Sequence, residues 1–281
     1  MRGAKDEEGE CPRILELTMS VHRIQAIFLR QLFLYKRSIP RLMGVLYWPV
    51  LDLVLWGFIT IYLNQYRGTL PAFVSFFLGA LILWDLLFRA QQGISISFLE
   101  DIWSRNLLNL FVSPISVSEY VISLMFVSLI KIILTASVSI FLAWLFYSFN
   151  IFIIGVSLLP LVLNLLLLGW AIGIFTTALI LRFGSQAEVL AWGVAFLFQP
   201  VSAVFYPVSV LPYPIQVLAM WVPSSHVFEG MRTVVSGGGF PVKELTWALS
   251  LNLFYLLFAT LFFFRMFKAV RVKGLLGKIG E

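Results

Sequence analysis

The sequence predicts an all-α integral membrane protein with six transmembrane helices. Of its 281 residues, 60% are hydrophobic and only 12% are charged, and the mean hydropathy is +0.94. Soluble globular domains are roughly 45–50% apolar and about 25% charged, so this composition excludes that class. A helix needs about 20 apolar residues to cross ~30 Å of hydrocarbon. Six stretches meet this requirement: 42–63, 70–88, 120–147, 151–181, 189–206 and 245–265.

Two segments precede the first span. Residues 1–13 are polar and charged without an apolar core, so we expect a disordered cytoplasmic tail and no signal peptide. Residues 14–41 are expected to form an amphipathic interface helix, because apolar residues recur every three or four positions from Leu17 to Leu32. A basic amphipathic helix beside a span usually lies in the membrane interface. The sequence leaves open whether this helix is only an anchor or also a docking surface for a cytoplasmic partner.

The distribution of basic residues predicts the topology. The stretch from Tyr120 to Leu181 could hold two long helices or three short ones. With two, both termini lie on one side of the membrane together with 16 Lys and Arg residues, against 3 on the other side, and Lys131 lies inside a span. Because basic loops stay in the cytoplasm, we expect a multi-pass protein of the cell membrane with both termini cytoplasmic. The basic tail, 269–281, then lies inside, whereas three helices would place it outside.

The connection after the second span, 89–119, is too long for a simple turn. It contains charged Glu100 and Asp101, and Ser113-Pro114 interrupts its helical pattern. Ser116 and Glu119 have the spacing of a capping box, which predicts the start of the third span. Two interpretations stay open for the short cytoplasmic helix expected here: an ordinary amphipathic connector, or a helix that contacts a partner.

The segment 207–232 is expected on the outer side of the membrane. Residues 208–222 are almost wholly apolar, but they are too few to span a bilayer and Pro212 interrupts them. Apolar, irregular backbone of this kind is typical of re-entrant or interfacial segments. A short helix follows, on which Glu229 and Arg232 are three positions apart and can pair. The sequence therefore predicts a structured outer lid or gate.

Three ionisable residues lie inside the predicted spans: Asp52, Asp85 and Lys131. Charges at membrane depth cost several kcal/mol and usually face a bundle interior or a cavity. They either line a transport path or form an internal ion pair between Lys131 and one of the aspartates. Gly169 and Gly173 form a GxxxG pattern, which predicts close helix packing within one chain or across a dimer.

The sequence offers no signature of catalysis or of cofactor binding. Cys11 is the single cysteine, and His22 and His226 are far apart, which argues against a disulfide framework and a metal site. No GxxxxGK[ST] or GxSxG motif is present, so we expect no enzyme activity in this chain and no phosphate-binding loop. The formal charge of +6 follows from the topology and does not indicate nucleic acid. ATP-driven transport would need another polypeptide to supply the energy.

From about Met19 to Val272, the layout resembles the membrane subunit (permease) of type-2 ABC exporters. The stretch 100–119, with Arg105 and Ser113-Pro114, is similar to the loop by which that family contacts its ATPase. The run FYPVSVLPYPIQVLAMWVPSSHVFEGMR, 205–232, is similar to the outer re-entrant helices before the last span, and it is the more specific of the two matches.

The resemblance implies a half-transporter that pairs with a second copy in the lipid membrane. Each copy would bind one cytoplasmic ATP-binding subunit, which carries the ATP and Mg²⁺, and the pair would export an amphipathic drug, lipid or lipid-linked glycan. Two sets of residues acquire expected roles: coupling to the ATPase for Arg30, Glu100, Asp101 and Arg105, and an outer gate for Tyr206, Pro207, Pro212, Glu229 and Arg232.

Two other functions compete with this expectation. An ion-coupled secondary transporter would use Asp52, Asp85 and Lys131, and transport by the chain alone that is lost in Asp52→Asn would favour it. A membrane-embedded lipid enzyme would need convergent catalytic groups, for which only the cluster around His226 is eligible. That hypothesis requires His226→Ala to be inactive.

Overall fold

The computed structural model describes residues 19–67 and 71–272, and every regular element in these ranges is helical. In chain order, the elements are α1 (Val21–Lys36), α2 (Ile39–Arg67), α3 (Pro71–Trp103), α4 (Leu107–Val112), α5 (Val117–Tyr147), the 3-10 helix η1 (Ile151–Ser157), α6 (Leu158–Phe183), η2 (Gly184–Ala187), α7 (Glu188–Val201), η3 (Val208–Val210), α8 (Tyr213–Ala219), α9 (Pro223–Val235) and α10 (Val242–Val272). The predicted tail 1–13 lies outside the described residues, as does the predicted basic tail 269–281 except for 269–272, which form the end of α10.

Four segments among the described residues are long and apolar enough to cross a membrane: Ile39–Tyr62, Val117–Tyr147, Ile151–Phe183 and Val242–Val272. These segments and the all-helical fold agree with the predicted class of helical membrane protein. The structure also answers the question about 120–181, because α5 and η1–α6 fill it with two long segments. Neither α3 nor the shorter α7 belongs to these four, so the count of six spans stays a prediction.

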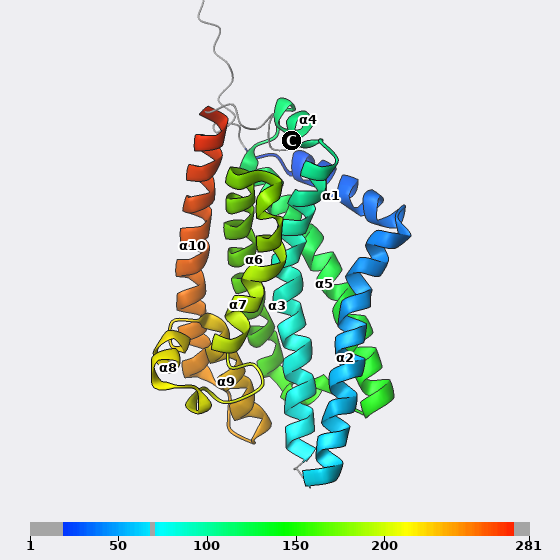
Figure 1. Cartoon of the computed structure of the whole chain (residues 1–281), viewed down its shortest axis with the longest axis vertical. Coiled ribbons are helices and arrows are strands. Elements are labelled where there is room, and N and C mark those ends of the chain that lie inside the picture. The colour runs from blue at the N-terminus through cyan, green and yellow to red at the C-terminus, as the bar shows by residue number, and fades with distance from the viewer. Residues whose placement is uncertain (1–18, 68–70, 273–281) are drawn as a thin grey trace, which may run out of the picture.

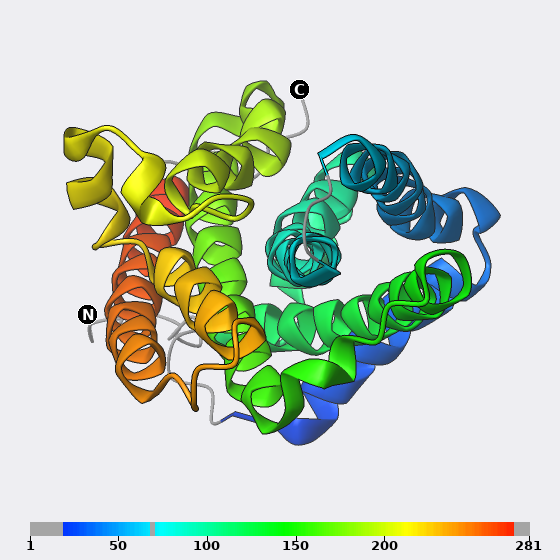
Figure 2. The ribbon, with the colours of Figure 1, turned by 90° about the horizontal axis from the view of Figure 1, so that it is seen from below.

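The bundle has two ends that differ in structure (Figure 1). One end carries α4, α1 and the last turns of α10, and we call it the α4 end. The small helices α8 and α9 lie towards the opposite end, called here the α9 end. Seen along the bundle, α2, α3 and α5 form one side, whereas α6, α7, α9 and α10 form the other (Figure 2).

The two sides of the bundle are joined by close packing between α3 and α6. A methyl group at Gly169 would lie 2.6 Å from the backbone oxygen of Leu87, and one at Gly173 would lie 2.9 Å from that of Gln91. Both distances are too short for a side chain, so only glycine lets the two helices approach this closely. The GxxxG pattern therefore serves packing within the chain. Apolar residues on both sides of this contact form the core, including fully buried Leu83, Leu87 and Leu165.

Local signals explain where α5 begins and ends. Ser116 Oγ accepts a hydrogen bond from the backbone N–H of Glu119 at 3.2 Å, and Glu119 Oε2 accepts one from the backbone N–H of Ser116 at 2.8 Å. The predicted capping box is thus confirmed. At the other end, Ser148 adopts a left-handed conformation, and the backbone N–H of Phe149 bonds to the carbonyl of Ala143. This is a common way to terminate a helix.

Several predicted boundaries differ from the structure. The interface helix expected over 14–41 ends at Lys36, and α2 already begins at Ile39. The loop expected over 89–119 is much shorter, because α3 continues without a break to Trp103 and only α4 and its flanking turns remain. The span expected over 189–206 ends as a helix at Val201. The long helix expected over 151–181 starts as η1, where Gly155 has a positive φ of 61°, and becomes α-helical from Leu158.

The reason for the long α3 lies in the burial of its polar half. Between 89 and 103 there is no proline, and the polar side chains Gln91 and Ser95 are buried and bonded to each other at 3.0 Å. Gln91 also donates to the carbonyl of Ala191 in α7. The polar sequence predicts a cytoplasmic connection, but these groups find partners inside the bundle, where an unpaired group would be costly.

Candidate functional site

At the α4 end, Asp101 is the centre of a buried polar cluster. Its side chain is 2% exposed and pairs with the guanidinium of Arg30. Its Oδ2 accepts hydrogen bonds from the Tyr120 hydroxyl at 2.7 Å and from Gln31 Nε2 at 3.4 Å. Charged groups are rarely fully buried unless they are paired in this way. Asp101 thus joins α1, α3 and α5.

Two further carboxylates fasten α1 to the same end of the bundle. Glu100 Oε1 accepts a hydrogen bond from the Tyr35 hydroxyl at 3.1 Å, and its Oε2 lies 3.9 Å from Nε of Arg41. Burial and the nearby Glu100 raise the pKa of Tyr35, so this hydroxyl stays a donor. Glu119, fully buried, accepts from the backbone N–H of Ser20 at 2.7 Å and lies 3.3 Å from Nε of Arg23.

Because of these contacts, the buried face of α1 differs from the apolar face that the sequence predicts. The residues of α1 that are buried are Ile27, Gln31 and Tyr35, whereas Val21, on the predicted apolar face, is 65% exposed. Gln31 and Tyr35 are inside because Asp101 and Glu100 bind their polar ends. Apolar periodicity alone could not indicate this, since it ignores partners on distant elements.

The predicted coupling residues therefore fall into two groups. Arg30, Glu100 and Asp101 face one another inside the polar cluster. Arg105 stands apart: it is exposed, has a positive φ of 52°, and belongs to the turn that ends α3. Around it, the exposed residues Trp103, Asn109 and Val112 form a small tip at the α4 end, which we call the α4 tip.

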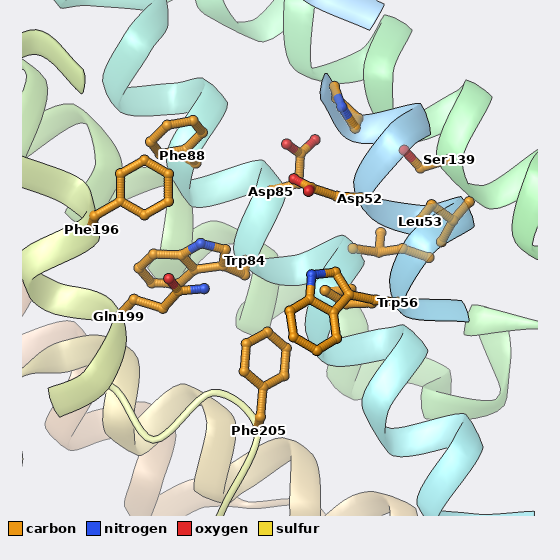
Figure 3. A pocket seen from close by; sticks show the side chains of 13 residues that line it. Asp52, Leu53, Trp56, Trp84, Asp85, Phe88, Ser139, Phe196, Gln199 and Phe205 are labelled. Atoms are coloured by element: carbon orange, nitrogen blue, oxygen red, sulfur yellow. The ribbon is translucent and has the colours of Figure 1, made fainter. Parts of the chain in front are cut away.

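At mid-bundle, a cavity of about 270 Å³ lies between α2, α3 and α7 (Figure 3). Its lining includes the two aspartates predicted to lie in spans, Asp52 of α2 and Asp85 of α3, and we call it the aspartate cavity. Aromatic rings surround them, among them Trp56, Trp84 and Phe205. Acidic groups among aromatic rings suit a cationic or amphipathic ligand, because ring faces also attract cations.

The two aspartates differ in their partners. Asp85 Oδ1 accepts from Nε of Arg89 at 3.2 Å, one helical turn further along α3. Asp52 is exposed, and it has no ion pair among the side chains that the structure describes. Lys131 is placed elsewhere: its Nζ donates to Ser97 Oγ at 3.0 Å and lies 4.3 Å from the centre of the Tyr35 ring. The ion pair expected between Lys131 and either aspartate is therefore absent from the described residues.

Towards the α9 end, Arg232 organises the backbone around the predicted gate. Its guanidinium donates to the carbonyls of Ala203 and Tyr206, and its Nη1 lies 3.0 Å from Glu229 Oε1. The predicted pairing of Glu229 with Arg232 is thus confirmed. Glu229 Oε1 also accepts from the backbone N–H of Val208 at 2.7 Å. Arg232 and Glu229 together hold 203–208 against α9.

The other gate residues lie in the same region but in different settings. The Tyr206 hydroxyl donates to the carbonyl of Pro200 at 2.8 Å. Pro207 and Pro212 are exposed and precede the first residues of η3 and α8, respectively. Proline suits these positions because its fixed φ favours the entry into a helix and its missing N–H is not needed there.

The cluster considered for catalysis does not converge. His226 bonds through Nδ1 to Glu244 at 2.9 Å and through Nε2 to the carbonyl of Met220 at 3.0 Å, while Glu229 is engaged with Arg232. Both ring nitrogens of His226 thus have structural partners. Within the described ranges, no group of three or more His, Cys, Asp or Glu residues is arranged to hold a metal ion.

No protein-family model and no curated protein matches this chain.

Proposed function

We propose that the chain is the transmembrane permease subunit of an ATP-driven exporter of the type-2 ABC class. In this proposal it pairs with a second copy, and each copy binds a separate cytoplasmic ATP-binding subunit. The pair moves an amphipathic substrate, such as a drug, a lipid or a lipid-linked glycan, out of the cytoplasm. The sequence resemblance from Met19 to Val272 suggested this function, and the arrangement of α3 supports it.

The observation that carries the proposal is the continuity of α3 between two polar sites. Asp85 lines the aspartate cavity, and Glu100 and Asp101 hold α1 at the α4 end. The 16 positions from Asp85 to Asp101 correspond to about 24 Å of unbroken helix at ~1.5 Å per residue. A rigid helix of this kind transmits a push at the α4 tip to the cavity. ATP-driven transport requires such a mechanical link, because the energy is released outside the membrane.

The proposal includes six spans, of which α3 and α7 are the two beyond the four apolar candidates. The positive-inside argument places the α4 end in the cytoplasm and the α9 end outside. The 14 residues of α7 extend about 21 Å, which is less than the ~30 Å of the hydrocarbon core. The segment 202–222 then completes the outer part as a re-entrant or interfacial unit. Its exposed apolar side chains, which include Tyr213 and Trp221, suit contact with lipid.

The exposed Asp52 favours a second copy of the chain. It lies within the apolar α2, where an exposed carboxylate facing lipid would cost several kcal/mol. The cost disappears if this face of α2 borders a water-filled path that a second permease closes. The aspartate cavities of the two copies would then line one shared path.

Purification of the tagged chain from its native membrane in mild detergent tests the proposal directly. We expect an ATP-binding subunit to copurify in equal amounts, identified by mass spectrometry. Arg105→Glu should reduce this recovery by roughly tenfold, because it reverses a charge at the exposed α4 tip, where electrostatic complementarity governs association. The matched control is Arg265→Glu, which reverses an exposed charge on α10.

Two results would contradict parts of this proposal. Recovery of the chain alone from several mild detergents would contradict the proposed partner. Equal losses in Arg105→Glu and Arg265→Glu would remove the α4 tip as the contact site, even if an ATP-binding subunit copurifies.

A second candidate function, ion-coupled secondary transport, is favoured by one observation: Asp52 and Asp85 share one cavity. For that function, the chain reconstituted alone in liposomes should transport its substrate when a proton gradient is imposed across the membrane. Asp52→Asn should abolish this transport, since it removes a titratable group without changing the size of the side chain. Absence of gradient-driven transport by the wild-type chain excludes this candidate.

A further inference from the structure

A second cavity, of about 370 Å³, lies nearer the α4 end, where the chain turns from α1 into α2. Its lining comes from the elbow between Tyr35 and Val45 and from α3, α5 and α7. Three cationic side chains line it: Arg41, Arg89 and Lys131. We call it the cationic cavity. Neither of the functions proposed above assigns a ligand to it.

The charges around the cationic cavity do not cancel. Arg41 lies near Glu100, the one carboxylate among the residues that line the cavity, and Arg89 is paired with Asp85. Lys131 has no carboxylate within ion-pair distance among the side chains that the structure describes; it has a hydroxyl partner, Ser97, and the ring of Tyr35. One positive charge is left over. An anion with a single negative charge would balance it.

An unpartnered hydrogen-bond donor lines the same cavity. The side chain of Gln92 is only 6% exposed, and its carbonyl oxygen accepts from Nη1 of Arg89 at 3.1 Å. This contact directs the amide so that Nε2 has no hydrogen-bond partner within the described part of the chain. A buried donor without a partner costs roughly 1–3 kcal/mol, so a ligand with acceptor oxygens would relieve this cost. Lys131 and Gln92 would therefore both be stabilised by an anionic ligand that has oxygen acceptors.

One acceptor in the lining also lacks a hydrogen bond. Glu100 Oε2 is buried, and its nearest cation, Nε of Arg41, is 3.9 Å away, which is too long for a hydrogen bond. A hydroxyl group on a ligand would supply the missing donor. The glycerol headgroup of a phosphatidylglycerol has hydroxyl groups that can donate to it. The cavity thus suits a phosphodiester that carries a hydroxylated headgroup.

The surroundings of the cavity favour a lipid over a free ion. Trp103 and Trp192 line it and are 50% and 41% exposed, respectively, and Val45 and Ile96 contribute further apolar lining. Tryptophan is enriched where headgroups meet the hydrocarbon core. The basic residues of α1 and of the elbow, among them Lys36 and Arg37, attract anionic lipid to the same place.

We propose that the cationic cavity binds the phosphodiester headgroup of an anionic phospholipid, with Lys131 and Gln92 contacting the phosphate oxygens. With the α4 end in the cytoplasm, as in the proposed function, this lipid belongs to the cytoplasmic leaflet, and only that placement rests on the proposed function. The binding site itself follows from the cavity, its uncompensated lysine and its unpartnered amide.

Native mass spectrometry of the detergent-purified full chain, without any partner subunit, tests this proposal. The probes are palmitoyl-oleoyl phosphatidylglycerol and the matching phosphatidylcholine, whose headgroup has no net charge and no donor. We expect tighter binding of phosphatidylglycerol, and a roughly tenfold loss of this binding in Lys131→Gln, the effect typical of one lost hydrogen bond to a charged group. Lys268→Gln, which neutralises an exposed lysine on α10, should bind like the wild type.

Two further measurements keep the test decisive. Lys131→Arg should retain most of the binding, which separates the loss of charge from misfolding, and Gln92→Leu should weaken binding without changing a charge. Sodium phosphate at about 100-fold excess over the lipid should not displace it. Displacement would assign the site to free phosphate and overturn the lipid proposal. Equal binding of both lipids, or unchanged binding in Lys131→Gln, would also overturn it.

Because no ATP-binding subunit takes part, the outcome is independent of the proposed function. Loss of lipid binding in Lys131→Gln with no copurified ATPase would retain the site and reject the exporter. Copurification of an ATP-binding subunit together with equal binding of both lipids would retain the exporter and reject the lipid site.

Discussion

Asp101→Ala is expected to lower the stability of the purified chain by about 3 kcal/mol and to release α1 from the bundle. The substitution removes the carboxylate that Arg30 and Gln31 of α1 share with Tyr120 of α5. It also leaves a partly buried guanidinium without its counter-charge, which costs more than the loss of the attraction itself. A fall of several degrees in the midpoint of thermal unfolding in detergent measures the effect. Faster hydrogen exchange in 21–36 locates it.

Asp52→Ala is the matched control for this experiment. It also removes an aspartate side chain, on the neighbouring helix α2, but Asp52 is exposed and has no ion pair among the described side chains. We expect its unfolding midpoint to stay within about 1–2 °C of the wild type, as is usual for surface substitutions. Equal midpoints for Asp101→Ala and the wild type would show that α1 is held by other contacts.

A double-mutant cycle separates the two halves of the Asp101 cluster. Tyr120→Phe alone removes one donor to Asp101 and should cost about 1 kcal/mol. In the Asp101→Ala background the same change should cost much less, because the acceptor is already gone. Additive losses would mean that the Tyr120 hydroxyl stabilises the chain through a different contact.

Short-range signals in the sequence predicted the local structure well. The capping box at Ser116 and Glu119 and the pair of Glu229 and Arg232 involve residues three positions apart, and both are confirmed. Such pairs need only a helix to bring them together. Apolar length left two or three helices open in 120–181; the distribution of basic residues favoured two, and the structure has two long segments there.

The partners of the charged residues could not be predicted in this way. Asp101 and Arg30 are 71 positions apart, and Lys131 and Ser97 are 34 apart, so only the tertiary fold brings these groups together. The sequence indicated that Lys131 needs a polar environment inside a span, but not which group would provide it. It also gave no sign that the polar residues after Arg89 continue a buried helix, because a polar stretch looks the same in a loop and in a bonded bundle interior.

Arg232→Gln is the second substitution with a large expected effect, at the opposite end of the bundle. It shortens the side chain that donates to the carbonyls of Ala203 and Tyr206 and pairs with Glu229. Ala203 is fully buried with a positive φ of 50°, a conformation that costs a non-glycine residue about 1–2 kcal/mol. The guanidinium stabilises this turn by satisfying its carbonyls. We expect a loss of about 2–4 kcal/mol in stability.

Hydrogen exchange distinguishes a local effect from general unfolding in this variant. Peptides covering 202–212 should exchange faster in Arg232→Gln, whereas those covering α5 should not change. Lys243→Gln, at an exposed lysine near the start of α10, is the control and should leave both regions unchanged. Glu229→Gln should have a smaller effect, because an amide oxygen can still accept from the backbone N–H of Val208. If 202–212 exchange at the wild-type rate in Arg232→Gln, the conformation of this segment does not depend on the arginine, and Arg232 has no role in an outer gate.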